Sequence, residues 1–164
     1  MSSPSSVIRL ARADEAAAAR TLARAAYAHY VPRMGREPAP MLADYGELIA
    51  AGELFLLERK GRLLGLIVLR SESDALFVEN VAVDRAAQGQ GLGRVLMGFA
   101  ETEACRRGAP LIRLYTNIAM TENLDFYPRL GFRETGRRVE DGYHRVYFEK
   151  PVQRPVETDK AGLC

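Results

Sequence analysis

The chain has 164 residues, 48% of them hydrophobic, and a formal net charge of +2. This length and apolar content predict one compact soluble domain. The interspersed charges exclude the clustered basic face of a dedicated nucleic-acid binder. The two cysteines, Cys105 and Cys164, are too few for a disulfide framework and are predicted to be free thiols in a reducing cytoplasm.

The domain organisation is predicted to be simple. Residues 1–5 are expected to be disordered, residues 6–150 to form one domain, and residues 151–164 to form an unpacked tail. The N-terminus lacks a signal-peptide pattern, and the longest apolar run is too short to cross a bilayer, which predicts a cytoplasmic protein without a membrane partner. The cysteines and the two histidines have no metal-ligand spacing, so no metal is expected.

Apolar periodicity and turn residues divide the chain into alternating elements. A helix from about residue 13 to residues 27–30 is expected to stop at Pro32, and residues 31–40 are expected to be a loop. The other predicted helices are residues 41–51, 92–107 and 120–130, with an irregular last turn at Pro128. The predicted strands are residues 7–10, 53–59, 63–70, 75–83, 111–116, 132–138 and 142–149. This order predicts an α/β fold with a mixed sheet and helices on both faces.

The most informative stretch is the glycine-rich turn at residues 88–94, which follows a strand ending at Val83 and opens a helix. The first N–H groups of a helix lack internal partners and carry partial positive charge, and glycine lets an anion approach the backbone. The turn therefore predicts a phosphate-bearing ligand. Arg94 stands where a dinucleotide fingerprint needs its third glycine, and the chain has no nucleotide P-loop, so neither of these readings fits.

The turn instead reads Gln88-Gly89-Gln90-Gly91-Leu92-Gly93, which matches the pattern [QR]-x-x-G-x-G. A second motif, "FYxxLGF", follows at residues 126–132. With these two motifs in this order, residues 6–150 resemble the GNAT family of N-acetyltransferases, most strongly over 76–132. The resemblance implies a GNAT-like, mostly antiparallel seven-stranded sheet with about four helices on both faces, and acetyl-CoA as the acyl donor.

The resemblance also implies roles for individual residues. The backbone of residues 88–94 would hold the pyrophosphate; the contributing residues are Gln88, Gly89, Gln90, Gly91, Gly93 and Arg94. The backbone of Val81 and Val83 would pair with the pantetheine arm as an added strand, beside a bulge near Asn80, and the Val81 N–H would polarise the thioester carbonyl. Many family members carry Asn seven residues before the helix tyrosine, where this chain has Met120. Asn123, one turn from Tyr127, is expected to supply the pantetheine contact from a shifted position.

Two residues are candidates for catalysis. Tyr127 matches the family tyrosine that protonates the leaving thiolate, and a phenol with a pKa of about 10 suits that task. Its alternative reading is a core aromatic residue. Glu79, in the strand beside the predicted thioester site, is the candidate base that takes a proton from the acceptor ammonium; its alternatives are an exposed strand residue and a structural ion pair.

The acceptor is left open by the sequence. Tyr30 and Arg33 follow the first helix, where family members usually shape the acceptor pocket, and the acceptor is expected to be a small-molecule amine or a peptide or protein amine. The predicted activity is direct transfer of acetyl to a primary amine in a ternary complex. The alternatives are transfer of another acyl group and a non-catalytic acyl-CoA sensor. Residues 143–148, read as an exposed closing strand, make a homodimer a further possibility.

Overall fold

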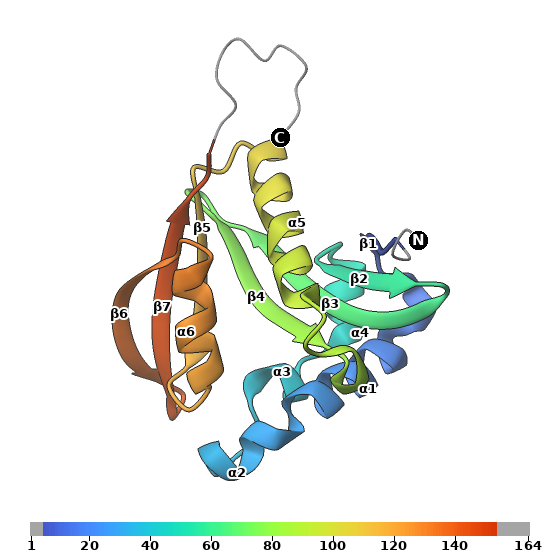
Figure 1. The fold of residues 1–164 in the computed structure, drawn as a ribbon, viewed down its shortest axis with the longest axis horizontal. Helices are drawn as coiled ribbons and strands as arrows, with labels where there is room; N and C mark the ends of the chain where they lie inside the picture. Colours follow the sequence, from blue (N-terminus) through green and yellow to red (C-terminus); the bar gives the residue numbers. More distant parts are fainter. Residues whose placement is uncertain (1–4, 154–164) are drawn as a thin grey trace. The chain divides into compact units, whose positions relative to one another are not determined.

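The computed structural model describes residues 5–153 and contains a seven-stranded sheet with the strand order β1-β2-β3-β4-β5-β7-β6 (Figure 1). The described strand pairs are antiparallel except for β4 (Leu76–Val83) with β5 (Leu111–Asn117), which is parallel. The predicted mixed, mostly antiparallel sheet is therefore confirmed. None of the helices in the described part of the chain is long and apolar enough to cross a membrane.

The chain forms two compact units, and three elements, β3 (Arg62–Ser71), β4 and α5 (Leu92–Arg106), each begin in one unit and end in the other. The first unit contains residues 1–69 and 79–96, and the second contains residues 70–78 and 97–164. Residues 1–4 and most of the predicted tail, residues 154–164, lie outside the described residues. The single domain predicted from the sequence stays a prediction.

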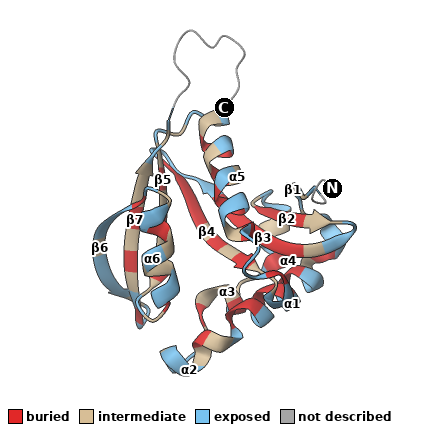
Figure 2. Cartoon of the chain, viewed as in Figure 1, coloured by how far each residue is buried: buried red, intermediate tan, exposed pale blue. Residues whose placement is uncertain are grey.

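The first unit is built around the hydrophobic strands β2 (Leu54–Arg59) and β3 (Arg62–Ser71). Residues 54–57 and 64–69 are buried (Figure 2), and Lys60 and Gly61, both with positive φ, form the predicted hairpin turn between the strands. Strand β1 (Val7–Leu10) pairs with β2 in antiparallel register. Helix α1 (Ala16–Tyr27) buries Ala19, Leu22, Ala23 and Ala26, which recur at helical spacing on one face.

The segment between α1 and β2 differs from its prediction. Residues 31–40, expected to be a loop, contain the short helix α2 (Val31–Met34), and the predicted helix at 41–51 is split into α3 (Ala39–Leu42) and α4 (Tyr45–Ala50). Pro32 and Pro40 occupy the first turns of α2 and α3. The backbone N–H groups of a first turn have no partner within the helix, so a proline, which lacks an N–H, is tolerated there and can begin a helix. Asp44 separates α3 from α4, because its side chain accepts a hydrogen bond from the Glu47 N–H and caps α4.

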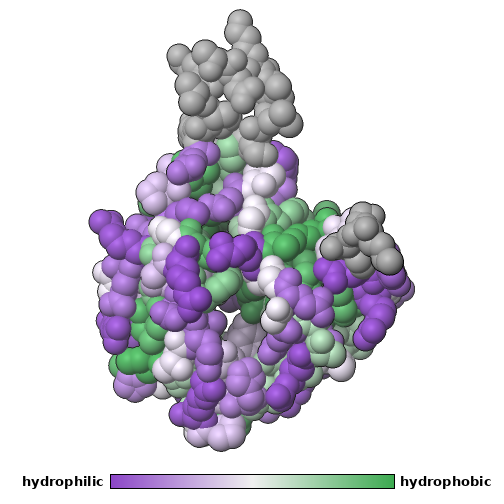
Figure 3. All heavy atoms as spheres, in the orientation of Figure 1, coloured by the Kyte–Doolittle hydropathy of each residue, from purple (hydrophilic) through white to green (hydrophobic). Residues whose placement is uncertain are grey.

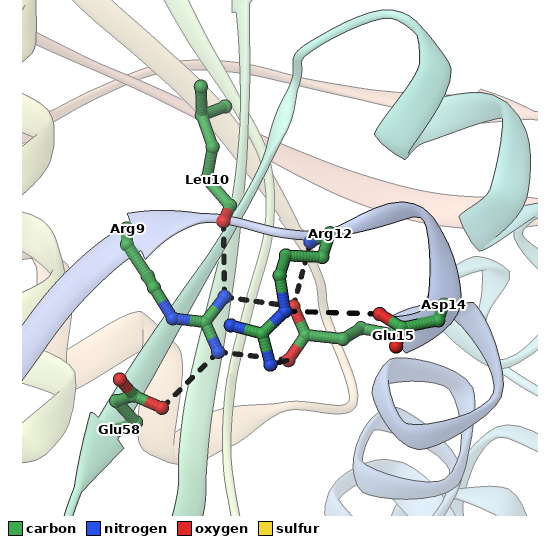
Figure 4. Close-up of polar contacts among 6 residues, drawn as sticks. All are labelled: Arg9, Leu10, Arg12, Asp14, Glu15 and Glu58. Atoms are coloured by element: carbon green, nitrogen blue, oxygen red, sulfur yellow. Dashed lines mark hydrogen bonds and ion pairs between the residues drawn. The ribbon is translucent and has the colours of Figure 1, made fainter. Parts of the chain in front are cut away.

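An ion cluster joins the start of the chain to β2 in the first unit (Figure 4). The Arg9 guanidinium donates two hydrogen bonds to the Glu15 carboxylate, at 2.8 and 2.9 Å, and one to Glu58 at 3.2 Å. Glu15 is buried at the end of the 3₁₀ turn η1 (Ala13–Glu15) and also accepts from the Arg12 N–H at 2.7 Å. These bonds lower the pKa of Glu15 to about 2, mainly through Arg9, and raise the pKa of Arg9.

The second unit is organised around β5. This strand pairs with β4 over residues 76–78 and with β7 (Tyr143–Pro151) along its whole length. The β4–β5 ladder comprises three residue pairs and stops just before the bulge predicted near Asn80. Helix α6 (Thr121–Arg129) lies along β7 in Figure 1, with the Tyr127 and Phe148 rings 5.8 Å apart. Pro128 stands in the last turn of α6, which ends in the irregular turn predicted there.

The outer edge of the second unit is β6 (Arg133–Glu140), not the strand at 143–148. Strand β7 lies between β5 and β6, so reading residues 143–148 as an exposed closing strand was wrong, and the argument for a homodimer from that strand no longer holds. Strand β6 is mostly exposed and hydrophilic (Figures 2 and 3), with Arg133, Glu134, Arg137 and Arg138 exposed along it. Charged side chains of this kind protect an edge strand from pairing with other chains.

Candidate functional site

The glycine-rich turn has the backbone conformation that its sequence predicts. The 3₁₀ turn η3 (Arg85–Ala87) follows β4, and α5 begins at Leu92. Between them, Gly89 and Gly91 have φ values of +84° and +78°, a region that residues with side chains rarely adopt. A Cβ atom added to either glycine would meet no other atom within 4 Å. The space in front of this backbone is therefore open to a ligand.

The start of α5 can bind an anion. The first bond of the helix joins the Val95 N–H to the Gly91 carbonyl at 3.2 Å, so helix geometry leaves the N–H groups of residues 92–94 without intrahelical partners. The helix is 15 residues long, and its dipole adds partial positive charge at this end. Gln88, Gly89, Gln90, Gly91 and Arg94 are exposed, and Gly93 is half-buried. Donors, charge and open space together fit a pyrophosphate group.

The end of β4 leads directly into this turn. Glu79, Val81 and Val83 are half-buried, whereas Asn80 and Ala82 are buried on the opposite face, as the strand alternation predicts. The Val81 carbonyl accepts a hydrogen bond from the Tyr27 hydroxyl at 2.6 Å, and the Val83 carbonyl accepts one from the Gln88 side chain at 3.2 Å. Each carbonyl oxygen has a second lone pair, so both can accept a further bond.

The acceptor-pocket candidates Tyr30 and Arg33 are neighbours in the first unit. Tyr30 is buried at the end of the 3₁₀ turn η2 (Ala28–Tyr30), with its ring centroid 3.9 Å from that of His29. The guanidinium carbon of the exposed Arg33, on α2, lies 5.3 Å from the centroid of the Tyr30 ring. This is a cation–π contact, and it orients Arg33 over an aromatic face.

Tyr127 belongs to the second unit, where it is buried in an aromatic cluster on α6. Its ring centroid lies 5.3 Å from that of Phe126, 5.8 Å from that of Phe132 and 5.8 Å from that of Phe148. Tyr127 is 7% exposed. The "FYxxLGF" motif is therefore also a packing motif, because two of its phenylalanines hold the Tyr127 ring between the helix and the sheet.

Asn123 lies one turn before Tyr127 on α6. Its amide nitrogen donates to the hydroxyl of the buried Thr116 at 3.0 Å, which ties α6 to β5. This bond directs the amide oxygen of Asn123 away from Thr116. The residue therefore has a structural contact that its sequence position did not predict.

Three residues beside the predicted site were missed by the sequence analysis: Tyr27, Asn80 and Arg59. Asn80 had a readable signal, since it is a polar residue on the same strand face as apolar Leu76, Val78 and Ala82. Tyr27 and Arg59 had none, because their partners Asn80 and Gln90 lie 53 and 31 residues away in sequence. No periodicity or motif connects positions at such separations.

The cysteine prediction requires a correction. Cys105, on α5, is disulfide-bonded, so the prediction of a free thiol is wrong there and no longer supports a cytoplasmic location. Cys164 lies outside the described residues. Among residues 5–153, no group of three or more His, Cys, Asp or Glu side chains is arranged to hold a metal ion.

Comparison with known proteins gives one family match. Residues 50–134 match the model of the acetyltransferase (GNAT) domain, a range that contains β2 to α6, with the glycine turn and Tyr127. The mycothiol acetyltransferase of Thermomonospora curvata is 41% identical over 80 residues, which cover 48% of this chain and 27% of that protein. The mycothiol acetyltransferase of Jonesia denitrificans is 33% identical over 85 residues. The chain spans about a quarter of the length of these curated relatives.

Solved structures share the fold over nearly the whole chain. The PaiA N-acetyltransferase from Thermoplasma acidophilum, in complex with coenzyme A, has a TM-score of 0.75 at 17% identity, covering 90% of this chain and 99% of that one. The ribosomal-protein-S18-alanine N-acetyltransferase from Escherichia coli has a TM-score of 0.71 at 21% identity, covering 93% and 97%. At these identities the likeness establishes the fold.

Proposed function

Because this chain belongs to the GNAT acetyltransferase family, we propose that it transfers the acetyl group of acetyl-CoA directly to a primary amine, in a ternary complex. The observation that carries the proposal is the pair of positive-φ glycines at the start of α5, inside the region that matches the family model. A turn of this kind presents backbone N–H groups to an anion without side chains in the way. Coenzyme A carries the pyrophosphate that such a turn can bind.

The donor is held mainly by backbone groups in this proposal. The N–H groups of residues 88–94 bind the pyrophosphate, with Arg94 adding positive charge. The backbone of Val81 and Val83 pairs with the pantetheine arm, and the second lone pairs of their carbonyls support this role. The amide oxygen of Asn123, directed away from Thr116, supplies a further contact to the pantetheine.

The transfer step needs one base and one acid. Glu79, a half-buried residue of β4, takes a proton from the acceptor ammonium, directly or through water. The freed amine nitrogen attacks the thioester carbonyl carbon, whose developing negative charge the Val81 N–H stabilises. The new C–N bond forms as the C–S bond breaks, and the Tyr127 hydroxyl gives its proton to the departing thiolate. The acetylated nitrogen then loses a second proton, which returns through water to the Tyr127 oxygen.

The acceptor is proposed by chemical class alone. Tyr30 and Arg33 form a cation–aromatic pair after α1 that suits an amine carrying a carboxylate or phosphate, since a guanidinium binds such groups in bidentate fashion. The name of the E. coli neighbour specifies an alanine N-acetyltransferase, and this supports an amine as the acceptor. Small amines and peptide amines both remain within the proposal.

The decisive experiment follows coenzyme A release across a panel of polyamines, amino acids, aminoglycosides and peptides. Acceptor-dependent release with the wild-type chain, lost by at least tenfold in Tyr127→Phe, supports the proposed enzyme. Tyr143→Phe is the matched control, because Tyr143 is also buried at 7% in the second unit. Tight binding of acetyl-CoA without release for any acceptor would instead identify a sensor and overturn the proposed activity.

The phosphate turn is tested separately by Gly91→Ala, which we expect to weaken coenzyme A binding by at least tenfold. Gly52→Ala is the control, because Gly52 has a similar φ of +70° and equally open surroundings, at the end of α4. Both variants carry the same backbone strain of about 1–2 kcal/mol. Unchanged affinity in Gly91→Ala would contradict the assignment of the pyrophosphate to this turn.

A further inference from the structure

A buried hydrogen-bond network lies inside the first unit, centred on Asn80 of β4. Asn80 is 6% exposed, and its amide sits between two tyrosine hydroxyls. The amide nitrogen lies 3.0 Å from the Tyr45 hydroxyl, and the amide oxygen lies 2.7 Å from the Tyr27 hydroxyl. Tyr45 in turn donates to the Pro40 carbonyl at 2.6 Å, and Tyr27 reaches the Val81 carbonyl at 2.6 Å. The network therefore joins α1 and α4 to β4.

The groups of this network supply one hydrogen-bonding proton fewer than their contacts require. When the Asn80 nitrogen faces Tyr45, the amide donates one proton to the Tyr45 hydroxyl, and the Tyr45 hydroxyl donates its own proton to the Pro40 carbonyl. The single Tyr27 proton then serves both the Asn80 oxygen and the Val81 carbonyl. Turning the amide over supplies Tyr27 with a donor but leaves the Tyr45 proton shared between the Asn80 oxygen and the Pro40 carbonyl. Burial raises the pKa of Tyr45 to about 12, so its phenol keeps its proton at neutral pH.

The contact between Tyr27 and Val81 constrains the backbone of β4. A side chain from a helix, not a neighbouring strand, here bonds the carbonyl of a strand residue. Because a peptide unit is planar and trans, a fixed Val81 carbonyl also fixes the direction of the Ala82 N–H on the other side of the same plane. The Tyr27 hydroxyl, held in turn by Asn80, is therefore positioned to set the orientation of peptide 81–82.

We propose that Tyr27 is a positioning residue for acyl-CoA, with its hydroxyl holding peptide 81–82 in the orientation that the pantetheine arm needs. This inference rests on the proposed function, which assigns the Val81–Val83 backbone to that arm. Tyr27 acts through Val81, and Asn80 keeps the Tyr27 hydroxyl in place. Tyr45, at the far end of the network, contributes to stability without touching Val81.

The test compares Tyr27→Phe with Tyr45→Phe, since each removes one hydroxyl from the same buried network. We expect Tyr27→Phe to weaken acetyl-CoA binding about tenfold and to raise the KM for acetyl-CoA, with the KM for the amine unchanged. Tyr45→Phe should keep wild-type affinity while losing comparable thermal stability. Binding of ADP, which carries the pyrophosphate without the pantetheine arm, should be the same in the wild type and both variants. Equal acetyl-CoA affinity in the two variants would overturn the proposal.

The double variant Tyr27→Phe/Asn80→Leu separates positioning from stability. It replaces two polar partners by apolar groups, so it leaves fewer buried polar groups unsatisfied and should recover part of the lost melting temperature. Its acetyl-CoA affinity should stay as weak as that of Tyr27→Phe, because the Val81 carbonyl still lacks its donor. Recovery of affinity together with stability would overturn the proposal. A wild-type chain that binds neither ADP nor acetyl-CoA would instead overturn the proposed function.

Discussion

The guanidinium of Arg59, at the end of β2, donates a hydrogen bond to the side-chain oxygen of Gln90 at 3.1 Å. Gln90 stands between the two positive-φ glycines of the phosphate turn, so this bond ties the middle of the turn to the sheet. Arg59 also donates to the Ser6 hydroxyl at 3.1 and 3.3 Å, which fixes the guanidinium from the other side. The glycine turn is thus held by a residue outside its own motif.

The first prediction follows from this tether. Arg59→Gln should weaken coenzyme A binding roughly three- to tenfold, about 1 kcal/mol, because one exposed charge-assisted bond to the turn is lost. Titration calorimetry at two salt concentrations measures the effect. Lys60→Gln is the control, since it removes the same charge from the exposed neighbouring position. An equal loss in the two variants would show that net charge, not the tether, is responsible.

Most of the fold could be predicted from local sequence patterns. The prediction failed where one residue type, proline, can serve two structural purposes. The strands β2, β3 and β4 were predictable because their apolar runs end at polar turns with glycine or aspartate. The end of α1 before Pro32 was predicted correctly, but the new helix α2 that contains Pro32 was not, because proline ends one helix and begins the next with the same sequence signal. The phosphate turn was predictable because its backbone chemistry is local. The Tyr27–Asn80 and Arg59–Gln90 contacts were not, since they depend on how distant elements pack.

The second prediction concerns the pH dependence of stability at Glu15. Its pKa falls from an ordinary value of 4.5 to about 2 in the folded chain, mainly through Arg9. Because the pKa of Glu15 is lowered in the folded state, its ionised carboxylate stabilises the fold fully above pH 4.5, and this stabilisation is lost as the pH falls toward 2. We expect Glu15→Gln to lower the free energy of unfolding by about 2 kcal/mol at pH 7 and by almost nothing at pH 2. Urea unfolding across this pH range measures it.

Glu58→Gln is the matched control for this prediction. Glu58 contacts the same arginine through one bond of 3.2 Å, and its side chain is 29% exposed against 10% for Glu15. Its loss should therefore cost under about 1 kcal/mol. Parallel stability curves for Glu15→Gln and the wild type between pH 2 and pH 7 would contradict the linkage.

The third prediction separates the structural role of Asn123 from its proposed contact with the pantetheine arm. Asn123→Ala and Thr116→Val should each destabilise the chain by about 1 kcal/mol, because each breaks the 3.0 Å bond between α6 and β5. The double variant should lose less than the sum of the two, since the bond can be lost only once. Coenzyme A affinity should fall in Asn123→Ala, which removes the amide, and should fall less in Thr116→Val, which keeps the amide but removes the partner that orients it. If affinity holds in both, Asn123 is a structural residue alone.

The fourth prediction concerns Gly65, which sits in β3 against the backbone of β4. A Cβ atom at this position would lie 3.1 Å from the Ala82 carbonyl oxygen and 3.1 Å from a methyl carbon of Leu96. The carbonyl belongs to a paired strand and cannot move as a side chain could, so Gly65→Ala should destabilise the chain by about 1–3 kcal/mol. Gly98→Ala, on the exposed side of α5 with no atom within 4 Å of the added Cβ, should stabilise it by about 0.5–1 kcal/mol. Guanidinium unfolding of the two variants should therefore shift the midpoint in opposite directions.

Because Ala82 follows Val81, Gly65→Ala should also weaken acetyl-CoA binding, whereas Gly98→Ala should leave it unchanged. A stabilising Gly65→Ala would mean that β3 and β4 can separate at this point without cost, contrary to the close packing of their backbones.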